Sequence, residues 1–125
     1  VNVVIITPIH SDVHVVDIIR RHYLGGLHQA GVKLFFYTAG NLHAKGIMID
    51  QDVFSISSAN FDYRSFRYQY ELALIGKEKS LIPQLREHFD SSLKYCTSFD
   101  YQSWKKRSTV ERIIELMLLP FRYLF

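Results

Sequence analysis

The chain has 125 residues, of which 48% are hydrophobic and 22% charged, and a formal net charge of +3. This composition is typical of a folded globular domain, or part of one, and excludes a disordered chain. The mild positive charge suits an anionic partner such as a phosphodiester or an anionic membrane face. The single cysteine, Cys96, excludes an internal disulfide and a cysteine metal cluster, and it fits a reducing compartment.

The predicted elements alternate between strands and helices. The sequence opens on the apolar run VNVVIITP without an initiator methionine, which we interpret as a fragment of a longer protein. The order predicts an α/β fold, with a mixed β-sheet flanked by helices. In chain order, the patterns predict a strand at 1–7, a helix at 12–30 that stops at Gly31, strands at 32–37, 43–50, 53–58 and 68–76, and helices from Ser80 and Ser108.

The last helix carries its own signals. Ser108 and Glu111 fit a capping box ahead of an apolar run, so we expect an amphipathic apolar helix over 108–125. Neither this run nor any other reaches the roughly 20 residues that span a bilayer. With the basic cluster KKR before it, the helix fits either the headgroup region of an anionic membrane or a core or partner surface, and both interpretations stay open.

A group of polar side chains surrounds the two strands at 43–50 and 53–58. They follow the pattern H-x-K-x4-D-x6-S-S-x-N, from His43 to Asn60. Because side chains two apart on a strand share a face, we expect His43 and Lys45 to point the same way and Asp50 to point away. If the two strands form a hairpin, the side chains of Ser58 and Asn60 converge on the same spot.

Such a set of side chains suits a phosphate. Lys45 would supply a fixed cation, and Ser58 and Asn60 would supply hydrogen bonds. His43 is the candidate nucleophile or general acid/base, because imidazole titrates nearest to neutral pH. Glu71 is the candidate carboxylate that orients a histidine.

The other histidines do not indicate a metal site. His10 and His14 are four apart, as metal ligands on a helix can be, but a third ligand is not evident, and we predict no metal site.

The extended motif resembles that of the phospholipase D superfamily, most closely the C-terminal catalytic half of bacterial cardiolipin synthases. The segments LHAKGIMID and SSANFDYRSFRYQYELAL carry this resemblance. One departure is Ser57, where the family usually has glycine, and its side chain would narrow a phosphate pocket. The matching residues are His43, Lys45 and Asp50 of the H-x-K-x4-D motif, the trailing Ser58 and Asn60, the downstream Glu71, and the supporting Asp62, Arg64 and Ser65.

The resemblance implies a fold and an activity. Residues 1–107 would be one half of a pseudo-symmetric catalytic domain, and 108–125 a separate C-terminal helix. Two histidines, one from each half or from each of two copies, would transfer a phosphatidyl group through a phosphohistidine, with no cofactor. The substrates would be two phosphatidylglycerol molecules, at the cytoplasmic side of a bacterial cell membrane.

Some questions stay open within this resemblance. Asp50 is either catalytic with the rest of its motif or structural, fixing the loop NFDYRS, and Arg64 either pairs with a carboxylate or holds a headgroup. A metal-independent endonuclease or phosphodiesterase acting as a dimer is an alternative, although the charge shows no basic stripe for nucleic acid, and we expect no nucleic-acid partner. A non-catalytic lipid- or protein-binding module is a second alternative.

Overall fold

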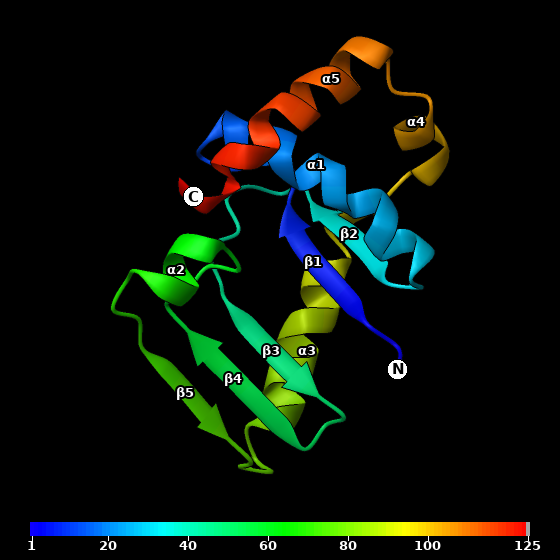
Figure 1. Cartoon of the computed structure of the whole chain (residues 1–125). Coiled ribbons are helices and arrows are strands. Elements are labelled where there is room, and N and C mark those ends of the chain that lie inside the picture. The colour runs from blue at the N-terminus through cyan, green and yellow to red at the C-terminus, as the bar shows by residue number, and fades with distance from the viewer. Residues whose placement is uncertain (125) are drawn as a thin grey trace.

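The computed structural model describes residues 1–124 (Figure 1). It confirms the predicted order of the long elements and the capping box of Ser108 and Glu111. No helix in this part of the chain is long and apolar enough to cross a membrane. The elements are β1 (Val4–Pro8), α1 (His14–Gln29), β2 (Lys33–Tyr37), β3 (Gly46–Ile49), β4 (Val53–Ser57), α2 (Tyr63–Arg67), β5 (Ala73–Gly76), α3 (Ile82–Leu93), β6 (Cys96–Ser98), α4 (Tyr101–Lys105), α5 (Thr109–Leu118) and the 3₁₀ helix η1 (Leu119–Leu124).

The strands form two three-stranded sheets. In the first, β1 pairs with β2 in parallel, through the crossover helix α1, and β6 pairs antiparallel to β2. In the second, β3, β4 and β5 form an antiparallel meander. The α/β fold with mixed strand pairing and flanking helices is therefore confirmed, although the strands form two sheets.

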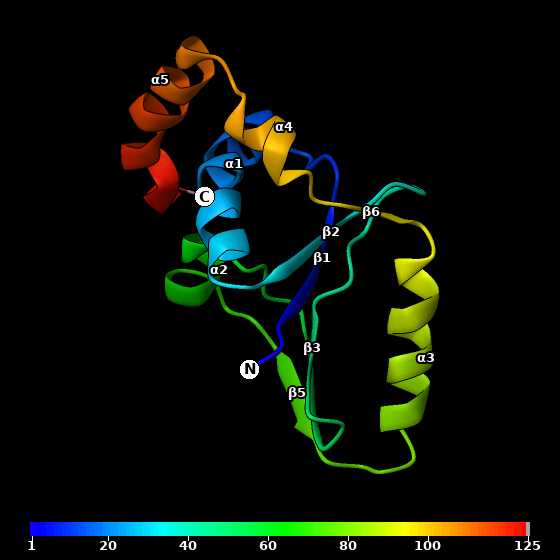
Figure 2. The same cartoon turned by 90° about the vertical axis from the view of Figure 1, so that its right-hand side faces the viewer.

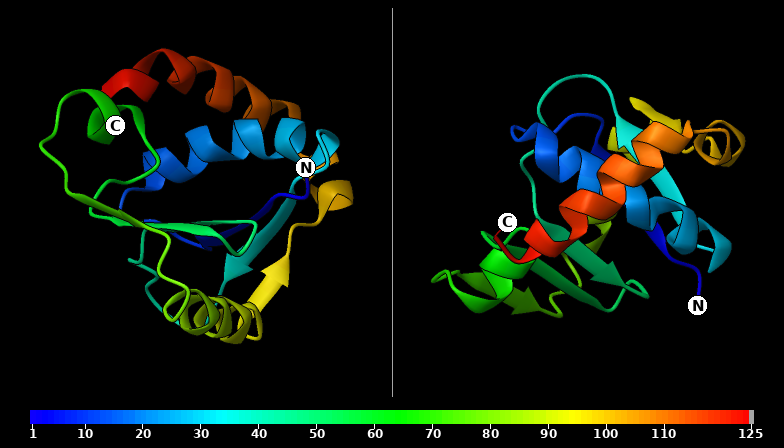
Figure 3. Two further views of the ribbon diagram at one scale, coloured as in Figure 1. Left: turned by 90° about the horizontal axis from the view of Figure 1, so that it is seen from below. Right: turned by 45° about the horizontal axis from the view of Figure 1, so that its top comes forward.

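The helices lie on both sides of the strand layer. Figures 2 and 3 show α1 on one side and α3 on the other, with α5 stacked outside α1. The buried apolar side chains come from two helices and two strands, so the core lies between the helices and the strands. They are Ile19 and Leu24 of α1, Leu34 of β2, Phe54 of β4 and Ile82 of α3.

The hairpin between β3 and β4 turns one residue earlier than predicted. Asp50 and Gln51 form the turn, both with positive φ (50° and 61°), and the Asp52 amide donates to the Ile49 carbonyl at 3.0 Å. Two left-handed central residues match the twist of the flanking strands. Asp50 therefore belongs to the turn, and the predicted strand over 43–50 is shortened at both ends.

The predicted strand over 68–76 is wrong in its first half. A short helix, α2, ends at Arg67, and only Ala73–Gly76 pair with β4. The prediction also missed β6 and α4, which lie in the connection before Ser108. The helix predicted over 108–125 divides into α5 and η1, and its last residue, Phe125, lies outside the described residues.

Candidate active site

Most of the predicted site residues, but not Asp50, lie in the segments just before β3 and just after β4. His43 and Lys45 precede β3, but the ladder extends to Lys45, since the Ser57 amide donates to the Lys45 carbonyl at 2.9 Å. The next amide, that of Ser58, donates to the carbonyl of Leu72 at 2.9 Å. Three chain segments thus meet within one ladder, at the end of the sheet that lies next to α2 (Figure 1).

The strand pairing differs from the one on which the predicted convergence of side chains depends, so that prediction is wrong in its register. Gly46 pairs with Ile56, which places Lys45 opposite Ser57 rather than opposite Ser58. Ser58 lies beyond the end of β4, where alternation of side chains no longer holds. The Lys45 ammonium donates to the carbonyl of His43 at 2.9 Å, so the lysine folds back over its own segment.

Ser58 and Glu71 are in direct contact. The Ser58 hydroxyl donates to the Glu71 carboxylate and accepts from the Leu72 amide at 3.0 Å. Glu71 precedes β5 by two residues, in an irregular segment. Among residues 1–124 no hydrogen bond joins Glu71 to an imidazole, so its role in orienting a histidine stays a prediction.

The predicted supporting residues connect to this pair through α2. Asp62 caps the helix, accepting from the Ser65 amide at 2.7 Å, and Ser65 is buried. The Gln69 amide, in the orientation that satisfies its neighbours, donates to Glu71 Oε1 (3.0 Å) and Ser65 Oγ (3.2 Å) and accepts from Arg64 Nε (3.2 Å). Asp62 and Ser65 thus support the site structurally, and Arg64 contacts an amide rather than a carboxylate.

Gln69 is a site residue that the sequence interpretation missed. We expected it within the strand predicted at 68–76. The available signal was its spacing, four residues after Ser65 and two before Glu71. That spacing indicates a contact only when the residues before Gln69 form the short helix α2.

Asp50 lies at the opposite end of the hairpin from Lys45 and Ser58. The expectation that it fixes the loop NFDYRS is therefore wrong, because that loop follows the other end of β4. A catalytic role for Asp50 in this chain stays a prediction.

The site is open to solvent. The side chains of His43, Ser58, Asn60 and Glu71 are exposed, and that of Lys45 is half-buried. An ammonium, an imidazole, hydroxyls and an amide are suited to holding a phosphoryl group and moving a proton on it. Among residues 1–124, no group of three or more His, Cys, Asp or Glu side chains is placed to hold a metal ion.

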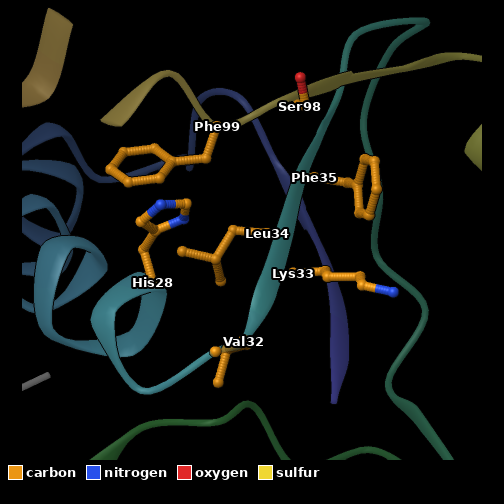
Figure 4. Close-up of a pocket in the computed structure, with 8 residues that line it drawn as sticks. His28, Val32, Lys33, Leu34, Phe35, Ser98 and Phe99 are labelled. Carbon is orange, nitrogen blue, oxygen red and sulfur yellow. The ribbon is translucent and has the colours of Figure 1, made fainter. Parts of the chain in front are cut away.

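Two hollows in the described part of the chain lie elsewhere. One, of about 250 Å³, lies between the end of α1 and strands β2 and β6, lined by His28, Leu34 and Phe99 among others (Figure 4). The other, of about 260 Å³, lies beside Arg20, whose burial lowers its pKa, while Asp17 opposes that shift. Neither hollow contains a predicted site residue.

The mixed sheet, the antiparallel sheet, the flanking helices and the histidine–lysine segment are those of a phospholipase D-like domain. Residues 1–93 match the family model described as "Cardiolipin synthase, PLD-like domain". The chain belongs to this family.

Individual proteins with similar sequences support this family assignment. The chain is 35% identical to a cardiolipin synthase of Clostridium perfringens strain SM101 over 118 residues, which are 94% of this chain and 25% of the relative. It is 31% identical to cardiolipin synthase 1 of Bacillus cereus over 115 residues, 92% of this chain and 23% of the relative. A cardiolipin synthase of Oceanobacillus iheyensis is 36% identical over 86 residues, 69% of this chain and 18% of the relative. The chain thus spans at most about a quarter of the length of these relatives.

Proposed function

We propose that this chain is the C-terminal catalytic half of a phosphatidyltransferase that makes cardiolipin. The observation that carries the proposal is that Lys45, two residues after His43, pairs with Ser57, next to the Ser58 that bonds Glu71, in a chain of this family. The substrates are two molecules of phosphatidylglycerol, and the products are cardiolipin and glycerol.

The proposed reaction has two displacements at phosphorus. A histidine nitrogen attacks the phosphodiester of the first phosphatidylglycerol, the bond from phosphorus to the glycerol oxygen breaks, and the other histidine protonates the leaving glycerol. That second histidine then takes the proton of a hydroxyl on the second phosphatidylglycerol as its oxygen displaces the first histidine. His43 is one of the two.

Lys45, Ser58 and Asn60 stabilise the negative charge that gathers on the phosphoryl oxygens. The exposure of Ser58 and Asn60, and of His43, supports the proposal, because a second half of the site must still be able to reach them. That half comes from the remaining length of the protein or from a second copy. The enzyme works at the cytoplasmic face of a bacterial membrane, where its lipid substrates are.

A lipid assay on the complete enzyme tests this proposal. We expect phosphatidylglycerol to give cardiolipin and glycerol in equal amounts in the presence of EDTA, and His43→Ala to lower the rate by at least about 10³-fold, because a covalent step is lost. The matched control is His88→Ala, an exposed histidine of α3, which should keep its rate. A phosphorylated histidine that survives base and is lost in acid should accumulate in the first displacement.

Two results would contradict the proposal. Unchanged turnover in His43→Ala would remove that histidine from the reaction. Loss of activity with EDTA, restored by zinc, would show that the reaction requires a metal and would contradict the proposed metal-independent chemistry.

A further inference from the structure

Helix α5 is oriented the opposite way to an ordinary amphipathic helix. Glu115 is its buried residue, with 1% of its surface exposed, and its carboxylate accepts two hydrogen bonds from Arg107, at 2.9 and 3.0 Å. Glu111, four residues earlier and on the same face, pairs with Arg21 of α1 at 3.2 Å. Glu115 therefore points inward and is neutralised there, whereas Glu111 is neutralised at the surface, with 46% of its side chain exposed.

The apolar face of α5 consequently points outward. We call this surface the tail stripe, and its members recur at three- and four-residue spacing from α5 into η1. Their exposed fractions lie between 43% and 68%, on a helix that is itself outside α1 (Figure 3). The tail stripe consists of Val110, Ile113, Ile114, Met117 and Phe121.

Positive charge borders the tail stripe. Lys105 and Lys106 are exposed just before α5, and Arg112 joins them because its guanidinium donates to the carbonyl of Lys105. Residues 105–124 contain five Lys or Arg and two Glu, so the net charge of this segment, +3, equals that of the whole chain. With Glu115 paired to Arg107 and Glu111 to Arg21, the remaining charges of this segment are cationic.

We propose that the tail stripe and its basic border form a docking surface for anionic lipid bilayers. Apolar side chains at the level of the acyl boundary, with Lys and Arg among the headgroups, are the arrangement of an interfacial helix. A second copy is a poorer occupant, because packing two stripes together brings two +3 segments into contact. The choice of lipid rests on the proposed function, whereas the orientation of the stripe does not.

The docking surface also adjoins the candidate active site. The rings of Tyr123 in η1 and Tyr63 in α2 lie 4.7 Å apart, edge to face. Helix α2 follows directly on the loop from Ser58 to Asp62. The 3₁₀ helix in which the tail stripe ends therefore contacts the helix that follows this loop.

Co-sedimentation with vesicles tests the proposal on this chain, without any turnover. We expect binding to vesicles of equal parts phosphatidylglycerol and phosphatidylcholine, and at least about tenfold weaker partition to phosphatidylcholine alone. Met117→Glu should weaken binding at least about tenfold, because it removes an apolar side chain that would enter the bilayer and adds a negative charge. Ile75→Glu, an equally exposed position on β5, is the matched control and should bind as the parent does.

The basic border has its own variant. Lys105→Gln together with Lys106→Gln should lower partition to the anionic vesicles about fivefold for each lysine removed, with no effect on phosphatidylcholine vesicles. Circular dichroism of every variant should show parent-like helix content, because all these positions are exposed.

Three results would overturn the proposal. The first is equal vesicle binding by the parent and Met117→Glu, and the second is equal partition to neutral and anionic vesicles. The third is a chain that ignores vesicles but self-associates in gel filtration until Met117→Glu makes it monomeric, since the stripe would then be a protein interface. None of these results would contradict the proposed transfer reaction, which the lipid assay on the complete enzyme tests separately.

Discussion

The corner where α1, α4 and α5 meet and the end of the β3–β4 hairpin use polar side chains in opposite ways. At the corner, Arg107 is enclosed between Glu115 and the ring of Trp104, 3.7 Å from its guanidinium carbon, and the Trp104 indole donates to the carbonyl of Arg21 at 2.8 Å. At the hairpin, the Ser58 hydroxyl and Glu71 carboxylate meet at the surface.

The difference separates stability from chemistry. Polar atoms at the corner are removed from water and are committed to internal partners, so losing one leaves its partner buried and uncompensated. Polar atoms at the hairpin remain solvated, so losing one costs little in folding but removes a group that a substrate would contact. Variants on each side should therefore separate stability from turnover.

The largest loss of stability should come from Glu115→Ala. It leaves the Arg107 guanidinium buried without its carboxylate, and we expect the free energy of unfolding to fall by about 3–5 kcal/mol. Guanidinium chloride unfolding, followed by far-ultraviolet circular dichroism, measures it. The double variant Arg107→Met/Glu115→Leu should recover most of the loss, because it buries no charge. A loss below about 1 kcal/mol in the single variant would show that the pair is solvated.

A pair of neighbouring glycines in α1 gives the next effect. A Cβ on Gly25 would lie 2.0 Å from Cη2 of Trp104, whereas one on Gly26 would meet nothing within 4 Å. We expect Gly25→Ala to lower the free energy of unfolding by about 1–3 kcal/mol, because the indole must move. Gly26→Ala should raise it by about 0.4–1 kcal/mol through helix propensity. The same unfolding experiment checks both, and equal effects would mean that Trp104 does not pack on α1.

Long elements were predictable because their apolar residues repeat over enough positions to fix a period. Helix α1 and the apolar run of α5 are such cases, whereas strands β1 and β2, of five residues each, were predictable as continuous apolar runs. The missed elements α2, β6 and α4 have five residues or fewer, too short for periodicity. After one of them, α2, the alternation of Tyr68, Gln69 and Tyr70 imitated a strand that begins only at Ala73.

For the site, the residue types were predictable and their geometry was not. The pattern from His43 to Asn60 identifies groups that suit a phosphate, but the register of β3 on β4 depends on a turn that begins at Asp50. Likewise, the apolar stripe of α5 has the same spacing whether it faces inward or outward. Its direction is set by Glu115 meeting Arg107, a pairing that only the folded chain brings together.

The smallest loss of stability should come from Ser58→Ala, at the hairpin. Its hydroxyl bonds Glu71 and the Leu72 amide at an exposed position, where water can replace it, so we expect a loss of under about 1 kcal/mol. In the complete enzyme the same variant should lower the rate of cardiolipin formation by about 10²-fold, because a donor to the phosphoryl oxygens is lost. Ser55→Ala, within β4, is the control that should leave the rate unchanged. If Ser58→Ala instead costs as much stability as Glu115→Ala and leaves turnover intact, the hairpin end is a structural brace, and the division between the two regions fails.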